Sequence, residues 1–210
     1  MSALKLRVYP PESDGVASGL AAVLAGSYDV PLEFREPPVI LDIGAHVGSF
    51  SVWAAHRWPG ATITAFEPSP SNADYARQNL EGIAEVVERA VVGPGRPGAL
   101  LLHEGRDNTG QRSIHRLGEQ KAEGLMVRTR RASTLPPCDI FKADTEGCEL
   151  EILDDYRHLS TVRAVMLEYH SLEDYHTLLK LLPSRGLTLV RNDTGGRWAH
   201  DRNLIFVRGT

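Results

Sequence analysis

From residue 39 onward, short apolar runs alternate along the chain with longer segments of helical composition. Runs of this kind suit strands buried on both faces of a sheet, and each longer segment suits a crossover helix. The predicted strands are 39–43, 61–66, 84–92, 139–144 and 162–168, and the predicted helices are 49–58, 70–80, 148–156 and 172–182. Alternating strands and helices form parallel βαβ units, so the pattern predicts a doubly wound α/β sheet with helices on both faces.

The end of the chain departs from this alternation. Segments 187–191 and 203–207 have strand composition, and only the turn-rich segment 192–202 separates them. Two strands without a helix between them form a hairpin, which predicts one antiparallel strand at an edge of a mostly parallel sheet. Further strands are predicted at 99–103 and 125–129, and the long polar connection between them is expected to face a substrate.

Length and charge limit the classes of function. A chain of 210 residues suits one main domain, which we place at 39–210, with residues 1–38 as an N-terminal cap. The net charge of −4 is unfavourable for nucleic-acid binding, which needs a concentrated basic surface. We therefore expect a small-molecule acceptor and no nucleic-acid partner, and the sequence leaves the oligomeric state open.

The expected location is the cytoplasm. No apolar run reaches the roughly 18 residues of a membrane-spanning helix, and the N-terminus lacks the apolar stretch of a signal peptide. Cys138 and Cys148 do not have the spacing of a metal-binding pair, and two free thiols are typical of a reducing compartment. No membrane partner is expected.

A glycine-containing turn follows the first predicted strand, with Asp42, Gly44, His46 and Gly48 at alternate positions. Glycines at a strand-to-helix turn let the backbone approach a ligand closely, although a tight turn without a ligand is the alternative. The spacing of the two glycines differs from the GxGxxG pattern of dinucleotide-binding proteins. The Asp42 carboxylate also suits a cationic ligand better than a pyrophosphate.

An acidic residue, Glu67, ends the second predicted strand and is followed by Pro68. In nucleotide-binding βαβ units, an acidic residue about 20 residues beyond the glycine turn accepts hydrogen bonds from ribose hydroxyls. A solvated surface carboxylate is the alternative for Glu67 taken alone. Its position relative to the glycine turn favours ribose binding.

Charged residues end two further strands of the predicted sheet. Lys142, Asp144 and Glu146 alternate in sequence, so in a strand they would share one side, and Glu168 and His170 end the next strand. Because ligands bind beyond the carboxyl ends of such strands, we predict that these five residues are catalytic. A structural ion pair between Lys142 and a glutamate, which would only hold the loop, is the alternative. They could supply a general base or bind a divalent metal. We favour the base and assign no metal site, because a hard cation takes about six oxygen ligands and fewer are visible.

Four stretches carry a family resemblance: LDIGAHVG (41–48), AFEPS (65–69), FKADTEGCEL (141–150) and MLEYH (166–170), with NLIFV (203–207) closing the sheet. In this order they resemble the FkbM family of S-adenosylmethionine-dependent methyltransferases. The KADTEG string is the most specific part, whereas the first two stretches fit most Rossmann-like methyltransferases. The resemblance implies a Rossmann-like class I methyltransferase fold, a seven-stranded, mostly parallel sheet with an antiparallel edge strand.

The resemblance also implies an activity: transfer of a methyl group from S-adenosyl-L-methionine, most often to a hydroxyl of a secondary metabolite or sugar. Asp42 would orient the ammonium of this cofactor, Glu67 would bind its ribose, and residues 88–90 would flank its adenine. The family usually has Asn where His46 stands, and a His can still donate a hydrogen bond there. The full set of expected cofactor-binding residues is Asp42, Gly44, His46, Gly48, Glu67, Pro68, Glu88, Arg89, Ala90 and Asp144.

Two other classes of function remain as alternatives. One is an NAD-dependent oxidoreductase on a similar sheet, which the absence of GxGxxG disfavours. The other is a non-catalytic cofactor-binding module that keeps the fold, which the acidic residues at several strand ends disfavour.

Overall fold

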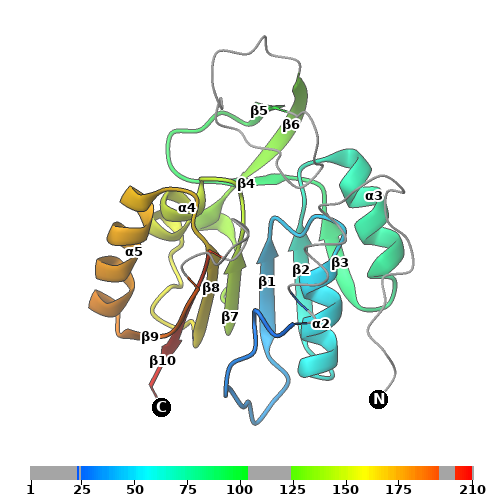
Figure 1. Ribbon diagram of the computed structural model, residues 1–210. Helices are drawn as coiled ribbons and strands as arrows, with labels where there is room; N and C mark the ends of the chain where they lie inside the picture. Colours follow the sequence, from blue (N-terminus) through cyan, green and yellow to red (C-terminus); the bar gives the residue numbers. More distant parts are fainter. Residues whose placement is uncertain (1–22, 24, 104–123, 194–201, 210) are drawn as a thin grey trace.

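The computed structural model describes residues 23, 25–103, 124–193 and 202–209 of the chain. Its main element is a seven-stranded sheet with the order β3-β2-β1-β7-β8-β10-β9 (Figure 1). The strands are β1 (Val39–Ile43), β2 (Thr62–Phe66), β3 (Ala84–Val87), β7 (Ile140–Ala143), β8 (Ala164–Glu168), β9 (Leu187–Asn192) and β10 (Asn203–Arg208). The helices are α2 (Ser49–Arg57), α3 (Pro70–Asn79), α4 (Glu149–Asp155) and α5 (Leu172–Ser184). The predicted α/β architecture is confirmed.

Strand β1 lies inside the sheet and pairs in parallel with β2 on one side and β7 on the other. Strand β10 runs antiparallel to both β8 and β9, so the predicted C-terminal hairpin is confirmed. The antiparallel strand is second from the edge, however, and not the edge strand itself. After β8, helix α5 leads to β9 at the edge of the sheet. The hairpin then places β10 between β8 and β9.

Serine caps begin two of the helices. The Ser69 side chain accepts a hydrogen bond from the Asn72 N–H before α3, and that of Ser171 accepts one from the Asp174 N–H before α5. Helix α5 was expected to stop at Pro183 but continues to Ser184, because a proline in the last turn removes only one hydrogen bond. Across the described part of the chain, no helix has the length and apolar character needed to cross a membrane.

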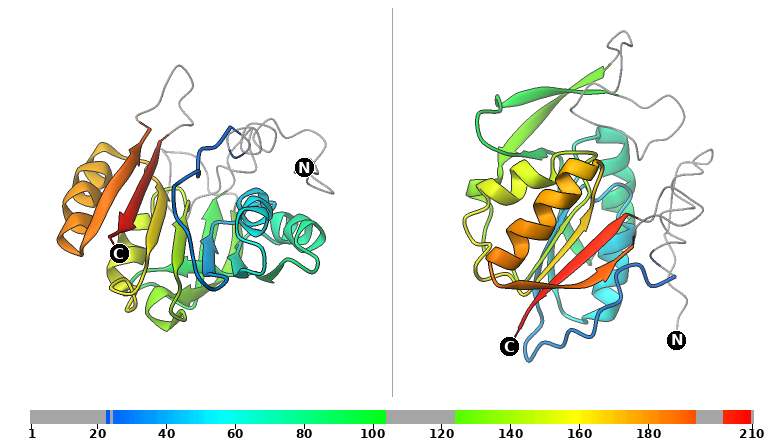
Figure 2. Two further views of the ribbon diagram at one scale, coloured as in Figure 1. Left: turned by 90° about the horizontal axis from the view of Figure 1, so that it is seen from below. Right: turned by 60° about the vertical axis from the view of Figure 1, so that its left-hand side comes forward.

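Helices cover both faces of the sheet (Figure 2). On one face, α4 and α5 pack against Leu41, Phe141 and Val165 of the central strands. On the other face, α2 packs against Ile40, Ile140 and Met166. Residues 28–32 of the N-terminal segment join this second core through side chains such as Tyr28 and Leu32. The proposed cap at residues 1–38 can be followed only in this part, because 1–22 and 24 lie outside the described residues.

A smaller sheet stands over the carboxyl ends of β1–β3, with the order β4-β6-β5 (Figure 1). Its strands are β4 (Ala90–Val92), β5 (Ala99–His103) and β6 (Gly124–Arg131). The single strand predicted at 84–92 is therefore wrong. The Arg89 N–H donates to the Val87 carbonyl, and this γ-turn directs the chain from β3 in the main sheet to β4 in the small one. The polar connection between β5 and β6 lies outside the described residues.

A buried ion pair joins the two central strands. Asp42 of β1 and Lys142 of β7 are register partners, and the Lys142 Nζ lies 3.1 Å from Asp42 Oδ1. The side chains are 0% and 4% exposed, respectively. Asp42 also accepts a 2.7 Å hydrogen bond from the Ser51 hydroxyl of α2. Burial alone lowers the pKa of Lys142, but Asp42 and Asp144 outweigh it and raise the pKa, so the ammonium keeps its charge.

Replacing Lys142 with methionine should destabilise the fold, because it leaves the Asp42 carboxylate buried without its cation. The expected loss in the free energy of unfolding is about 3–5 kcal/mol. The double variant Asp42→Asn/Lys142→Met removes both charges and should recover most of this loss. Urea unfolding of the three proteins measures the effect, and an unfolding midpoint unchanged in Lys142→Met would contradict it.

Candidate functional site

The turn between β1 and α2 has left-handed backbone at Gly44 (φ 78°), His46 (φ 53°) and Gly48 (φ 93°). A Cβ on Gly44 would lie 1.8 Å from the Asp144 carbonyl oxygen, so only glycine fits where the turn meets the end of β7. Packing inside the protein therefore requires this glycine, whether or not a ligand also approaches the turn closely. Asn, Asp and His are the non-glycine residues most often found at positive φ, so the backbone of this turn tolerates His46 as well as the Asn that the resemblance implies.

Glu67, at the end of β2, ties this turn to the one that follows β2. Its carboxylate accepts hydrogen bonds from the backbone N–H groups of His46 and Ser69, both at 2.9 Å, and from the Asn72 amide at 3.5 Å. The side chain is buried, and burial raises the pKa of Glu67 to about 7 despite these donors.

The environment of Glu67 fits a ribose. A carboxylate has about four lone-pair positions, and the raised pKa indicates that its three donors do not fully compensate for burial. Hydroxyl donors from a ribose would complete the set and favour the ionised form. The residues around the turn therefore fit the cofactor that the resemblance implies.

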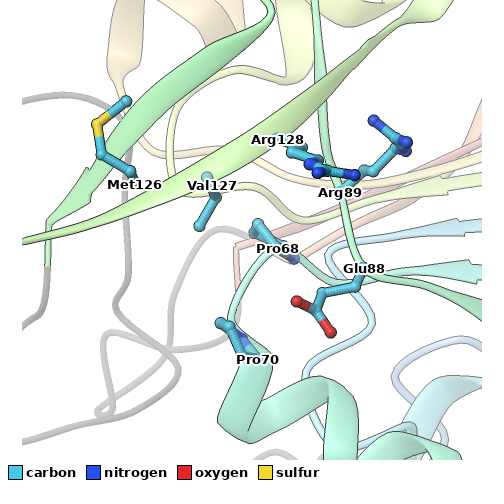
Figure 3. Close-up of a pocket in the computed structure, with 7 residues that line it drawn as sticks. All are labelled: Pro68, Pro70, Glu88, Arg89, Met126, Val127 and Arg128. Carbon is cyan, nitrogen blue, oxygen red and sulfur yellow. The ribbon is translucent and has the colours of Figure 1, made fainter.

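A pocket of about 390 Å³ opens at Pro68, the residue after Glu67, between the start of α3 and strand β6 (Figure 3). It is lined by Pro68, Pro70, Glu88, Arg89, Met126, Val127 and Arg128. Three residues expected to bind the cofactor, Pro68, Glu88 and Arg89, thus come together here. Ala90 does not line this pocket, because it is buried in β4. Met126 and Arg128 were missed, because nothing in the sequence indicates that β6 crosses above α3.

A second group of side chains gathers around His170, just after β8. The His170 Nε2 lies 3.3 Å from Glu146 Oε2 and 4.0 Å from both Asp144 Oδ1 and Glu168 Oε1. Four of the five predicted catalytic residues are therefore brought together. The basis of that prediction was partly wrong, because β7 ends at Ala143 and a turn with positive φ at Glu146 replaces the expected alternation.

Glu149 belongs to this group and was not predicted as a site residue. Its Oε1 lies 3.3 Å from His170 Nδ1, and its side chain is 2% exposed. The carboxylate also accepts hydrogen bonds from the N–H groups of Thr145 and Gly147. An acidic residue in the first turn of a helix is usual for helix capping, so its position in α4 gave no separate indication of this contact.

Lys142, the fifth predicted catalytic residue, lies apart from this group. Its ammonium donates a 2.7 Å hydrogen bond to the Gly44 carbonyl and faces Asp42. Asp42, expected to orient the cofactor's ammonium, is fully buried in the same ion pair. The two residues contact each other behind the glycine turn.

The carboxylates give His170 an unusual charge state. Burial alone lowers the pKa of His170, but Glu149, Asp144 and Glu146 outweigh it and raise the pKa to about 10. An imidazolium at neutral pH cannot accept a proton, so only the carboxylates of this group could act as a proton acceptor. Burial, with the nearby Asp144, raises the pKa of Glu146 to about 7 and that of Glu168 to about 9.

Three members of the group could also bind a metal ion. One potential ligand atom each from Asp144, Glu149 and His170 lie within 4.8 Å of one another. Glu149, however, already accepts backbone hydrogen bonds that metal coordination would have to accommodate.

In metal-free protein, His170 should titrate near pH 10, whereas a solvated histidine titrates near 6.5. Replacing Glu149 with glutamine removes the carboxylate that contributes most to the raised pKa of His170 and should lower this midpoint by about one unit or more. NMR of the imidazole resonances in the presence of EDTA measures both values. A wild-type midpoint near 6.5 would contradict the ion-pair geometry.

Comparisons with known proteins agree with the geometry. A family model described as "Methyltransferase FkbM domain" matches residues 42–188. Methyltransferase sdnD of Sordaria araneosa is 26% identical in an alignment that covers 81% of each chain. The AMB antimetabolite synthetase AmbE of Pseudomonas aeruginosa is 29% identical over 66% of this chain but only 9% of its own length.

Solved structures support the fold. The precorrin-6y C5,15-methyltransferase of Geobacter metallireducens superposes with a TM-score of 0.53 at 17% identity, covering 97% of this chain and 94% of that one. The family model covers the glycine turn, Glu67 and the His170 cluster, and the seven-stranded sheet agrees with the fold of the solved methyltransferase. The chain belongs to the FkbM family and is an S-adenosylmethionine-dependent methyltransferase.

Proposed function

We propose that the protein transfers the methyl group of S-adenosylmethionine to a hydroxyl of a small molecule, such as a secondary metabolite or sugar. The observation that carries this proposal is the group of carboxylates around His170. A hydroxyl must lose its proton during methyl transfer, and these carboxylates supply a proton acceptor at the carboxyl ends of β7 and β8.

Two observations support a small acceptor. The chain has a net charge of −4, which is unfavourable for binding nucleic acid. One relative is named an antimetabolite synthetase, which links a similar domain to the production of a small bioactive compound.

The division of roles follows from the positions of the residues. S-adenosylmethionine, when bound, supplies a methyl group activated for in-line displacement. Glu67 binds the ribose hydroxyls, and the pocket formed by residues such as Pro68 and Arg89 receives the adenine. Asp144 takes the proton from the acceptor hydroxyl, because it lies at the outer side of the group and is 29% exposed.

His170 and Glu168 complete this arrangement. The imidazolium of His170 keeps several carboxylates close together by offsetting their mutual repulsion. With its raised pKa of about 9, Glu168 carries a proton at neutral pH and can donate a hydrogen bond to the acceptor oxygen. Positioning accounts for most of the catalysis, since methyl transfer needs a linear approach of the acceptor.

The direct test is a methyl-transfer assay with labelled S-adenosylmethionine and a panel of hydroxyl compounds, each paired with its amine analogue. We expect label on the hydroxyl compounds. Transfer only to amines would contradict O-methylation. Cofactor binding without transfer to any member of the panel would favour the non-catalytic module.

Replacing Asp144 with asparagine should lower turnover by roughly 100-fold or more, because the amide cannot accept the proton. Binding of S-adenosylhomocysteine should change little, since the amide keeps the shape of the carboxylate. Near-normal turnover in Asp144→Asn would remove Asp144 from the mechanism. Activity lost in EDTA and restored by Mg²⁺ would favour a metal at Asp144, Glu149 and His170 over a protein base.

Replacing Glu67 with alanine should weaken binding of S-adenosylhomocysteine by about 2–4 kcal/mol, through loss of charge-assisted hydrogen bonds to the ribose. Binding by the wild type should also tighten as the pH rises through 7, because bound ribose donors favour the ionised carboxylate over the protonated form.

Because binding favours the ionised carboxylate, Glu67 should release part of a proton when the ligand binds near pH 7. Calorimetry in two buffers of different ionisation enthalpy would measure this release. The variant Glu67→Gln is the matched control, because it keeps the side-chain shape but cannot ionise and should lose the buffer dependence. Equal buffer dependence in both proteins would assign the proton to another group.

A further inference from the structure

We propose that Lys142 is a positioning residue for the cofactor: its ammonium fixes the Gly44 carbonyl and thereby the turn that organises Glu67. This inference rests on the proposed role of Glu67 in ribose binding. It assigns Lys142 a task different from direct participation in methyl transfer.

The first step of the argument is the geometry of the ammonium. The Lys142 Nζ lies 2.7 Å from the Gly44 carbonyl oxygen and 3.1 Å from Asp42 Oδ1. It also lies 5.8 Å from the centre of the Phe50 ring, at the start of α2. The ammonium is therefore surrounded by β1, the glycine turn and the helix that follows it, and its side chain is almost fully buried.

The second step is that pairing with Asp42 alone does not account for this lysine. A buried ion pair can often be replaced by apolar side chains without loss of stability. The extra hydrogen bond to Gly44 is a contact that an apolar pair could not make. It acts on a backbone carbonyl in the turn, whereas Asp42 has its own second partner, the Ser51 hydroxyl.

The third step connects the turn to the ribose carboxylate. Two residues beyond Gly44, the His46 N–H donates to Glu67 Oε2 at 2.9 Å. Both Gly44 and His46 have positive φ, so the turn has a backbone conformation that needs fixed contacts on either side. The peptide group that follows Gly44 is held on both sides, because its N–H donates to the Phe66 carbonyl at 2.9 Å and its carbonyl accepts from Lys142. Without the lysine, only the contact with Phe66 remains, and the alignment of the His46 N–H with Glu67 becomes less precise.

The test is calorimetric titration with S-adenosylhomocysteine, which is independent of the acceptor. The double variant Asp42→Asn/Lys142→Met removes both charges and the contact with Gly44. We expect it to be folded and to bind at least about 10-fold more weakly than wild type, the range of one lost positioning hydrogen bond. In the assay, the KM for S-adenosylmethionine should rise while kcat at saturation changes less than about 3-fold.

Ser51→Ala is the matched control. It removes a buried hydrogen bond to Asp42 in the same network but leaves the contact between Lys142 and Gly44. Its affinity for S-adenosylhomocysteine should stay within about twofold of wild type, even though its unfolding midpoint falls. Equal losses of affinity in Ser51→Ala and the double variant would show that the network serves the fold alone and would overturn the proposal.

A thermodynamic cycle with Glu67→Gln examines the connection itself. If Lys142 acts through Glu67, the losses of affinity from the two changes should be less than additive. Full additivity, or wild-type affinity in the double variant, would overturn the proposal. A second pair, Asp42→Leu/Lys142→Met, guards against misfolding of the first, and if neither pair folds, Lys142 serves the fold and the proposal is overturned. Unchanged affinity in Glu67→Ala would instead count against Glu67 as the ribose ligand, whatever the result for Lys142.

Discussion

The ion pair between Asp42 and Lys142 is the interaction on which the site depends. It lies between two central parallel strands, where a charged group is costly unless it has a partner. The same ammonium donates a hydrogen bond to the Gly44 carbonyl, so this buried ion pair is connected to the glycine turn between β1 and α2. On the far side of that turn, Glu67 accepts the His46 N–H, and the pocket beside Pro68 begins.

A different electrostatic arrangement prevails at the ends of β7 and β8. There one imidazole faces the carboxylates of Asp144, Glu146, Glu149 and Glu168. The crowding raises the pKa of His170 to about 10, and burial, with neighbouring charge, raises that of Glu168 to about 9. A cation and a protonated acid thus lie beside the Glu149 carboxylate, whose pKa, despite burial, is lowered by His170 and by backbone donors. Under the proposed function, this cluster handles the acceptor's proton and the residues around the glycine turn bind the cofactor.

Particular elements show where sequence reasoning succeeded and where it did not. The strands and helices of the main sheet follow from apolar runs and from local contacts such as the Ser69 cap. The division of 84–92 into β3 and β4 was missed, because the γ-turn at Arg89 is made from residue types that also fit a strand. Glu149 was missed because its sequence position is that of an ordinary helix-terminal acid, while its contact with His170 spans α4 and the end of β8.

The sequence by itself determined the doubly wound sheet, the family and the positions of the acidic strand ends, because these depend on periodicity and short motifs. Only the tertiary structure decided that Lys142 and Asp42 face each other behind the turn and that Glu149 joins His170. It also decided that β6 supplies Met126 and Arg128 to the pocket beside Pro68. The physical reason is that side-chain direction and charge state depend on neighbours distant in sequence, which burial, register and turn geometry bring together.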